Sequence, residues 1–176
     1  MKKIKIKTIK NKFLIDHSEF IENIAKIYKP KIYLELGLYR ADTFGRIRKH
    51  AKRAIAVDLV ILPGIEGELF QESTDTFFKH FDEQVDMIFI DADHSFDSLY
   101  KDLKNSLKIL NNPGIIILHD TDPEHIGLLH SDHCNDCYKI LEFLEQNDKI
   151  NAVTLPVSEA GLTIVTWKNQ LRINKI

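Results

Sequence analysis

The sequence is poor in the residues that mark several large classes of protein. Only two of its 176 residues are cysteines, which argues against a secreted disulfide scaffold and favours a reduced pair of thiols. No apolar run approaches the roughly 20 residues of a membrane-spanning helix. The basic stretch 1–12 is followed by only three apolar residues before Asp16, so it lacks the apolar core of a signal peptide. We therefore expect a cytoplasmic protein without a membrane partner.

Glycine-rich phosphate-binding motifs and a basic surface are also missing. The P-loop pattern G-x-x-x-x-G-K-[ST] occurs nowhere in the chain. A nicotinamide-dependent oxidoreductase would need G-x-G-x-x-G after its first strand, whereas residues 35–42 read ELGLYRAD and contain a single glycine. The net charge of −2 provides no general attraction to nucleic acid. We expect a small-molecule substrate and no nucleic-acid partner, and the sequence supports no particular oligomeric state.

What the chain does contain is a series of apolar runs that alternate with helical patterns, which is typical of an α/β fold. Asp16 and Glu19 resemble a capping box, and Pro30 ends the helix that follows. Further helices are expected over 43–50, after Ser73, from the cap Ser95 to Leu110, and over 136–146. The expected strands cover 32–34, 53–57, 68–71, 85–90, 115–118, 152–156 and 162–167.

These elements predict one domain over 1–176, in which 1–30 form an N-terminal extension and 31–176 the core. Within the extension, 3–9 alternate lysine and isoleucine, as an edge strand or tail would. The strands separated by helices should form a parallel sheet. The last two strands, joined at Gly161, should form an antiparallel hairpin.

The stretch from Lys31 to Asp58 points to a nucleoside. Gly37 follows the first strand of the core, and Asp58 stands at the end of the next one. In an open α/β sheet, ligands bind beyond the carboxyl ends of the strands, where a carboxylate can hold a ribose diol. Glycine in the turn lets a ligand approach the backbone closely.

Two regions resemble class I S-adenosylmethionine-dependent methyltransferases. The pattern E-x-G-x-x-x-A, followed by an acid at the end of the next strand, resembles their motifs I and II. Residues 85–123, with DADHSF and PGIIILHDT, are similar to the motif IV to V region of small stand-alone methyltransferase domains near the sugar and natural-product O-methyltransferases. The similarity extends over about residues 33–167. It implies a Rossmann-like, doubly wound, mostly parallel seven-stranded sheet with the last strand antiparallel, and O-methylation of a small polar metabolite or sugar.

The resemblance also implies a set of residues that bind S-adenosylmethionine. Glu35 would anchor its methionine end, although capping the next helix or pairing with Arg40 is an alternative role. Gly37 would let the cofactor approach the backbone closely, and Asp58 would form hydrogen bonds with the ribose hydroxyls. The residues expected near the adenine and the sulfonium are Ser73, Thr74 and Asp91, with Ser73 equally suited to capping a helix. The family's second glycine is replaced by Ala41, whose methyl group fits only where φ stays negative.

Acids and histidines after the fourth and fifth strands of the core are the candidates for catalysis. Asp91, His94 and Asp120 are the expected catalytic residues, with His94 taking a proton from a hydroxyl nucleophile. Asp91, Asp120 and His119 could instead hold Mg²⁺ or another divalent cation. Catechol-type methyltransferases have an asparagine as a third ligand where this chain has Thr121.

The histidine-rich segment 121–135 is long for a connection between a strand and a helix, as substrate-binding loops often are. His130, His133, Cys134 and Cys137 have a spacing that could bind zinc. The resemblance argues against zinc, because CNDCYK resembles the family's opening of the next helix.

Other functions remain open at this point. The chain could bind S-adenosylmethionine or a partner protein without catalysis, although its polar residues exceed the needs of a binder. A nicotinamide-dependent oxidoreductase is the second alternative. A nucleic-acid amino-methyltransferase would show N/D-P-P-Y/F after the fourth strand, where DADH stands here.

Overall fold

A computed structural model of the chain describes residues 16–168, so the strand predicted over 3–9 lies outside the described residues. The first helix and strand are α1 (His17–Tyr28) and β1 (Ile32–Leu36). The remaining helices are α2 (Asp42–Ile47), α3 (Thr74–His80), α4 (Phe96–Ile109) and α5 (Ile140–Glu145). The remaining strands are β2 (Arg53–Asp58), β3 (Glu68–Gln71), β4 (Val85–Ile90), β5 (Leu110–His119), β6 (Ile150–Leu155) and β7 (Leu162–Trp167).

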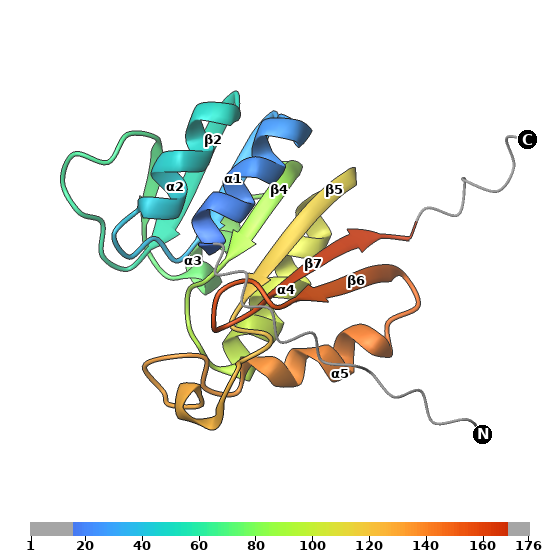
Figure 1. The fold of residues 1–176 in the computed structure, drawn as a ribbon. Coiled ribbons are helices and arrows are strands. Elements are labelled where there is room, and N and C mark those ends of the chain that lie inside the picture. The colour runs from blue at the N-terminus through green and yellow to red at the C-terminus, as the bar shows by residue number, and fades with distance from the viewer. Residues whose placement is uncertain (1–15, 169–176) are drawn as a thin grey trace, which may run out of the picture.

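The strands form one seven-stranded sheet in the order β3-β2-β1-β4-β5-β7-β6 (Figure 1). Strands β1 to β5 pair in parallel, and β7 pairs antiparallel with both β5 and β6. The chain runs outward from β1 in both directions, so the topological switch point lies between β1 and β4. The predicted doubly wound, mostly parallel sheet with an antiparallel C-terminal hairpin is confirmed.

Helices cover both faces of the sheet (Figure 1). On one face, α1 and α2 pack on the sheet through Ile21 and Phe44. On the other face, α3, α4 and α5 pack through residues such as Phe77, Leu103 and Ile140. The central strands are therefore apolar on both sides, as expected for a covered parallel sheet. In the part of the chain that the structure describes, no helix is long and apolar enough to cross a membrane.

The predicted start of the fifth strand was wrong. The Asn112-Pro113-Gly114 triplet was expected to separate a helix from a strand that begins at Ile115, but β5 already begins at Leu110. Val85 pairs with Leu110 and Met87 with Ile115, so β5 spans more residues than β4 between these two pairs. The triplet is therefore accommodated as an irregularity within the strand and not as a break before it.

The helix predicted over 136–146 is shorter than expected. The segment begins with a 3₁₀ turn, Cys137–Lys139, and α5 covers only Ile140–Glu145. The carboxylate of Asp136 does not cap this turn, because it accepts the backbone N–H of Phe96 at 2.7 Å and so caps α4 instead. A similar 3₁₀ turn, Arg48–His50, extends α2 over the range predicted as one helix.

Candidate active site

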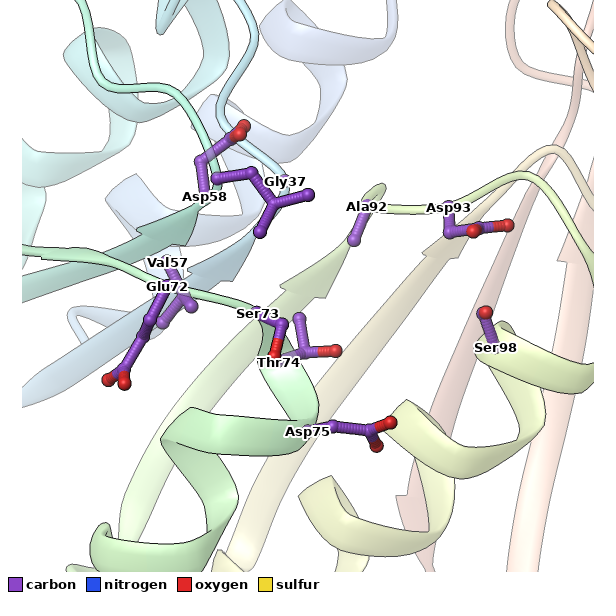
Figure 2. A pocket seen from close by; sticks show the side chains of 11 residues that line it. Gly37, Val57, Asp58, Glu72, Ser73, Thr74, Asp75, Ala92, Asp93 and Ser98 are labelled. Carbon is purple, nitrogen blue, oxygen red and sulfur yellow. The ribbon is translucent and has the colours of Figure 1, made fainter.

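A pocket of about 210 Å³ opens beyond the carboxyl ends of the parallel strands, next to the switch point (Figure 2). The turn after β1, the end of β2, the start of α3 and the loop after β4 surround it. Its lining residues are Gly37, Val57, Asp58, Leu59, Glu72, Ser73, Thr74, Asp75, Ala92, Asp93 and Ser98. Four of the predicted cofactor residues, Gly37, Asp58, Ser73 and Thr74, thus lie around one space.

Asp58 lines this pocket and also holds the turn after β1. Its Oδ2 accepts the backbone N–H groups of Leu38 at 2.6 Å and Tyr39 at 3.1 Å. Its Oδ1 accepts the N–H of Val60 at 3.0 Å. A carboxylate offers about four acceptor positions. The side chain is therefore fixed by the backbone around it and keeps part of its acceptor capacity.

Gly37 marks the closest approach between the turn after β1 and the end of β4. Its φ of +87° lies in the region that favours glycine. A Cβ at this position would stand 2.1 Å from the carbonyl oxygen of Asp91. Only glycine lets these two turns meet, and their meeting places Asp91 beside the pocket.

Ser73 has the capping role that was its alternative, and it lines the pocket as well. Its Oγ accepts the backbone N–H of Thr76 at 3.2 Å at the start of α3. Thr74 and Asp75, in the first turn of the same helix, face the pocket together with Ser98 of α4 (Figure 2). The predicted cofactor-binding set did not include Asp75, Asp93 or Ser98. Each of these residues could have been found from its position, either in the loop after a strand or in the first turn of a helix.

Glu35 lies away from the pocket lining, on the α1–α2 face of the sheet. It is 2% exposed and accepts hydrogen bonds from the Tyr33 hydroxyl and from the backbone N–H of Phe44. Burial raises its pKa well above the ordinary range, and the Tyr33 bond only partly offsets this. The residue before α2, Ala41, provides no side-chain cap, so Glu35 fulfils its alternative role as a cap. Its predicted contact with the cofactor stays a prediction.

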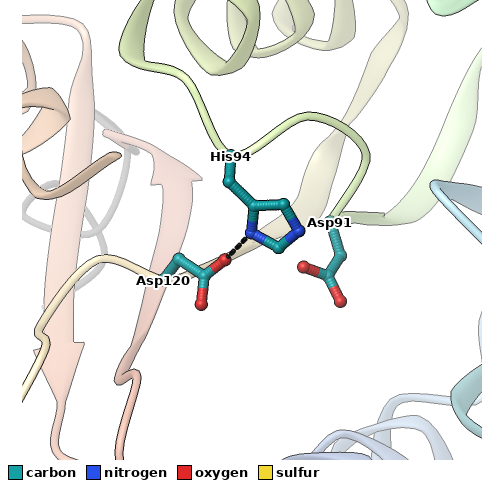
Figure 3. A group of neighbouring side chains, drawn as sticks. All are labelled: Asp91, His94 and Asp120. Carbon is teal, nitrogen blue, oxygen red and sulfur yellow. Dashed lines mark hydrogen bonds and ion pairs between the residues drawn. The ribbon is translucent and has the colours of Figure 1, made fainter. Parts of the chain in front are cut away.

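A second cluster lies just beyond, formed by Asp91, His94 and Asp120 (Figure 3). His94 Nδ1 donates a hydrogen bond to Asp120 Oδ2. The ligand-type atoms of the three residues lie within 4.8 Å of one another. The loop after β4 separates the two sites, because Ala92 and Asp93 line the pocket while Asp91 and His94 join this cluster. The three predicted catalytic residues are therefore neighbours.

His119 lies between the two carboxylates. Its Nδ1 is 3.0 Å from Asp91 Oδ1 and 3.1 Å from Asp120 Oδ1. Burial lowers the pKa of His119, but the charge of Asp91 and the bonds to both acids outweigh it and raise the pKa to about 10. Burial raises the pKa of Asp120, but hydrogen bonds from His119 and His94 hold it well below the usual range. The bond to Asp120 raises the pKa of His94. The imidazoles of His94 and His119 thus pair with the carboxylates of Asp91 and Asp120 and offset their negative charge.

Sequence reasoning missed His17, the first residue of α1. Its ring centroid lies 4.6 Å from that of His119 and 6.4 Å from that of Phe89. Burial and the charge of His119 lower its pKa. No local pattern marks this residue, because only the packing of α1 on the sheet brings it to the cluster.

The two cysteines form no metal-site group with the histidines of the loop in the part of the chain that the structure describes. Cys134 is buried, and its Sγ lies 3.3 Å from Asp120 Oδ1, whereas His130 and His133 are exposed. Among the described residues, the one group of acids, histidines or cysteines with metal-site geometry is Asp91, His94 and Asp120. The zinc hypothesis for the segment therefore gains no support.

The donor set of the cluster does not suit a hard cation well. Asp120 already accepts hydrogen bonds from His94, His119 and Cys134. Thr121, in the place of the third ligand, is buried and accepts a hydrogen bond from the Thr163 hydroxyl at 2.7 Å. A divalent cation would compete with these hydrogen bonds for the carboxylate oxygens, and Mg²⁺ prefers oxygen ligands, whereas the cluster also contains imidazole nitrogens. We therefore derive no step through a metal.

The comparisons with known proteins agree with the geometry. A family profile described as a methyltransferase domain matches residues 14–121. No curated protein matches the chain. Among solved structures, a Podospora anserina methyltransferase, PaMTH1, bound to SAH is similar at 20% identity and TM-score 0.71, over 87% of this chain and 78% of that one. An O-methyltransferase from Bacillus cereus in complex with SAH is similar at 15% identity and TM-score 0.66, over 86% and 80%.

A third similar structure is the O-methyltransferase TomG from Streptomyces achromogenes in complex with SAM, at 14% identity and TM-score 0.67, over 89% of this chain and 82% of that one. At such low sequence identities, the similarity to these structures supports the fold alone. The family profile covers more than half of the chain, so the chain belongs to the methyltransferase domain family. The resemblance to class I S-adenosylmethionine-dependent methyltransferases is confirmed.

Proposed function

We propose that the protein transfers the methyl group of S-adenosylmethionine to a hydroxyl group of a small polar metabolite or sugar. The observation that carries the proposal is the juxtaposition of a pocket of about 210 Å³, lined by Gly37, Asp58 and other predicted cofactor residues, with the His94–Asp120 pair. Only the loop after β4 separates the two. The first site suits the cofactor, and the second suits removal of a proton from an oxygen nucleophile.

The cofactor would lie across the carboxyl ends of β1, β2 and β4. Asp58 would accept hydrogen bonds from the ribose hydroxyls, and Thr74 and Asp75 would border the adenine. Gly37 would let the cofactor lie against the turn after β1, toward Asp91. Methyl transfer is an in-line displacement, so holding the sulfonium and the acceptor oxygen in line provides much of the rate enhancement.

His94 would act as the base. Its Nδ1 donates to Asp120, which leaves Nε2 to take the hydroxyl proton as the oxygen–methyl bond forms and the sulfur–methyl bond breaks. The products would be the methyl ether, S-adenosylhomocysteine and protonated His94. Because Asp120 raises the pKa of His94, activity should increase with pH until His94 is neutral.

The test begins with binding, measured by calorimetry with S-adenosylmethionine, S-adenosylhomocysteine and NAD. Tight binding of NAD alone would exclude the proposal in favour of an oxidoreductase. Mass spectrometry of ligands released from the denatured protein is an independent check. A cofactor that binds without any acceptor being methylated would indicate a binding module.

The catalytic part of the proposal is tested with labelled S-adenosylmethionine and a panel of hydroxylated metabolites and sugars. His94→Ala should lower kcat by roughly 10²- to 10⁴-fold, the usual contribution of general base catalysis, without weakening cofactor binding. His125→Ala, a change in the exposed loop, is the matched control. Methylation of nucleic acids or protein side chains alone would contradict the proposal.

A chelator separates this mechanism from a metal-dependent one. With His94 as the base and both carboxylates paired to imidazoles, dialysis against EDTA should leave kcat unchanged. Loss of activity that returns on addition of Mg²⁺ or Mn²⁺ would show that a cation replaces the imidazoles in the working enzyme.

A further inference from the structure

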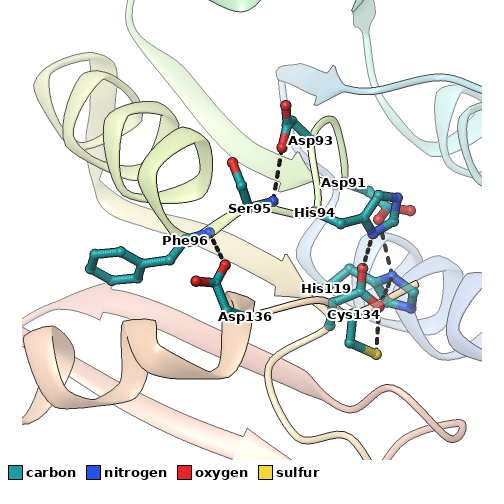
Figure 4. A network of polar contacts seen from close by, with 9 residues as sticks. Asp91, Asp93, His94, Ser95, Phe96, His119, Cys134 and Asp136 are labelled. Carbon is teal, nitrogen blue, oxygen red and sulfur yellow. Dashed lines mark hydrogen bonds and ion pairs between the residues drawn. The ribbon is translucent and has the colours of Figure 1, made fainter. Parts of the chain in front are cut away.

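The thiol of Cys134 contacts Asp120, which belongs to the proposed reaction centre formed by Asp91, His94 and Asp120. Cys134 follows Asp120 by fourteen positions, is 1% exposed, and places its Sγ 3.3 Å from Asp120 Oδ1 (Figure 4). Burial and the adjacent Asp120 raise the pKa of its thiol to about 12, so the group stays protonated at neutral pH. It therefore donates its S–H to the carboxylate.

Asp120 lies in a constrained position and is surrounded by hydrogen-bond donors. Its φ of +62° lies in the left-handed region, which is unfavourable for a residue with a Cβ. The carboxylate is held by three donors from three parts of the chain, His94 after β4, His119 at the end of β5, and Cys134. Although burial lowers the pKa of His119, the acids around it raise this pKa to about 10, and burial raises the pKa of the Cys134 thiol to about 12, so both donors keep their protons at neutral pH.

The backbone around Cys134 ties it firmly to the segment 121–136. Its N–H donates to the carbonyl of Leu128 at 3.0 Å, and its own carbonyl accepts the N–H of Cys137 at 3.1 Å. Two residues farther on, Asp136 accepts the N–H of Phe96 at 2.7 Å and thereby fixes the segment to the start of α4. A shift of this segment would carry the thiol away from Asp120.

We propose that Cys134 is a positioning residue whose thiol sets the orientation of the Asp120 carboxylate, and through it that of His94. The inference rests on the proposed function of His94 as the base. It makes the segment 121–136, which borders the reaction centre, part of the machinery that aligns the base. A bound acceptor that contacts and shifts this segment would then change the orientation of the His94 imidazole.

Cys137 provides a matched control. It is also buried, at 2% exposure, and comes from the same segment, yet its thiol forms no hydrogen bond within residues 16–168. If buried cysteines contribute only packing here, substitutions at Cys134 and Cys137 should have similar effects on the reaction centre.

The experiment compares Cys134→Ser, which keeps a donor, with Cys134→Ala and Cys134→Val, which remove it, and with Cys137→Ala. Imidazole ¹⁵N–¹H correlation spectra of histidine-labelled protein report the proton on His94 Nδ1, and His94→Gln identifies its signals. We expect the wild-type signal in Cys134→Ser and Cys137→Ala, and a changed tautomer balance in Cys134→Ala and Cys134→Val.

Kinetics add a second readout once an acceptor is known. Loss of the thiol donor should lower kcat by roughly 2- to 10-fold, about the effect of one hydrogen bond, with the KM for S-adenosylmethionine unchanged. Cys134→Val keeps the core filled if Cys134→Ala fails to fold. Identical spectra in Cys134→Ser and Cys134→Val, or a wild-type spectrum in both donor-free variants, would overturn the proposal. Because the spectra need neither cofactor nor acceptor, failure of the proposed function would be recognised separately.

Discussion

The carboxylate of Asp58, at the end of β2, accepts the backbone N–H of Leu38, in the turn after β1, at 2.6 Å. This bond joins the two motifs that the sequence presents twenty residues apart and gives the pocket a fixed wall. Asp58 both holds the turn after β1 in place and lines the pocket, and each of these roles can be tested.

Asp58→Ala should weaken binding of S-adenosylmethionine by about 1.5–3 kcal/mol, the range for hydrogen bonds to a charged group. Asp58→Asn keeps one acceptor oxygen and most of the shape, so its loss should be smaller. Titration calorimetry measures both affinities, and circular dichroism verifies that the variants keep the secondary structure of the wild type. Equal affinities in Asp58→Ala and the wild type would show that the ribose lies elsewhere.

Gly37→Ala should abolish cofactor binding and lower the unfolding temperature. The added Cβ would stand 2.1 Å from the carbonyl oxygen of Asp91, and a backbone atom cannot move aside cheaply. Gly45→Ala is the control, because its Cβ would have no neighbour within 4 Å and alanine is the better helix former. The unfolding temperature should therefore fall in Gly37→Ala and rise in Gly45→Ala, and calorimetry should show loss of cofactor binding only in Gly37→Ala. A Gly37→Ala protein that binds normally would show that the two turns adapt.

Ala41→Gly should stabilise the protein. Ala41 was expected to fit if φ were negative, but its φ is +63°, where a Cβ costs about 1 kcal/mol or more and glycine costs none. The greater freedom of glycine in the unfolded chain offsets part of this gain. We expect an increase of roughly 0.5 kcal/mol in the free energy of unfolding, measured by urea denaturation. A loss of stability would mean that the methyl group makes compensating contacts.

The contribution of His119 to stability should depend on pH. Burial lowers its pKa, but the surrounding acids raise it to about 10, above the value of about 6.5 in an unfolded chain. Such a group stabilises the folded state fully below about pH 6.5, and the contribution is lost as the pH rises toward 10. At the acidic end, Asp120, whose pKa is lowered in the folded state, loses its contribution as the pH falls below about 4.

The measurement is the difference in unfolding temperature between the wild type and His119→Gln. This difference should be largest between about pH 4 and 6.5 and should shrink steadily toward pH 10. His80→Gln serves as the control, because His80 pairs with Glu72 in a half-exposed position. A difference that stays constant with pH would show that His119 contributes only packing.

The fold was largely predictable because its signals are local. Apolar runs such as Val85–Ile90 and caps such as Ser95 follow directly from neighbouring residues. Errors arose where a distant partner overrides local preference. Asn112-Pro113-Gly114 lies within β5 because β4 pairs on either side of it, and Asp136 caps α4 and not its own turn.

The same distinction applies to the site. Residues at strand ends, such as Asp58, Asp91 and Asp120, could be placed together because parallel strands end at one edge of the sheet. Capping of the next helix by Glu35 was predicted only as an alternative, and the contact of Cys134 with Asp120 was not predicted. Each depends on a partner brought close by packing, which is Phe44 of α2 for the first and Asp120 for the second.

The division made by the loop after β4 has an evolutionary consequence. Ala92 and Asp93 line the pocket, while the flanking Asp91 and His94 belong to the second cluster. Under the proposed function, substitutions in the segment 121–136 would alter the preference for the acceptor and leave the lining of the pocket unchanged. Such a protein could change its acceptor during evolution while it keeps its contacts with S-adenosylmethionine.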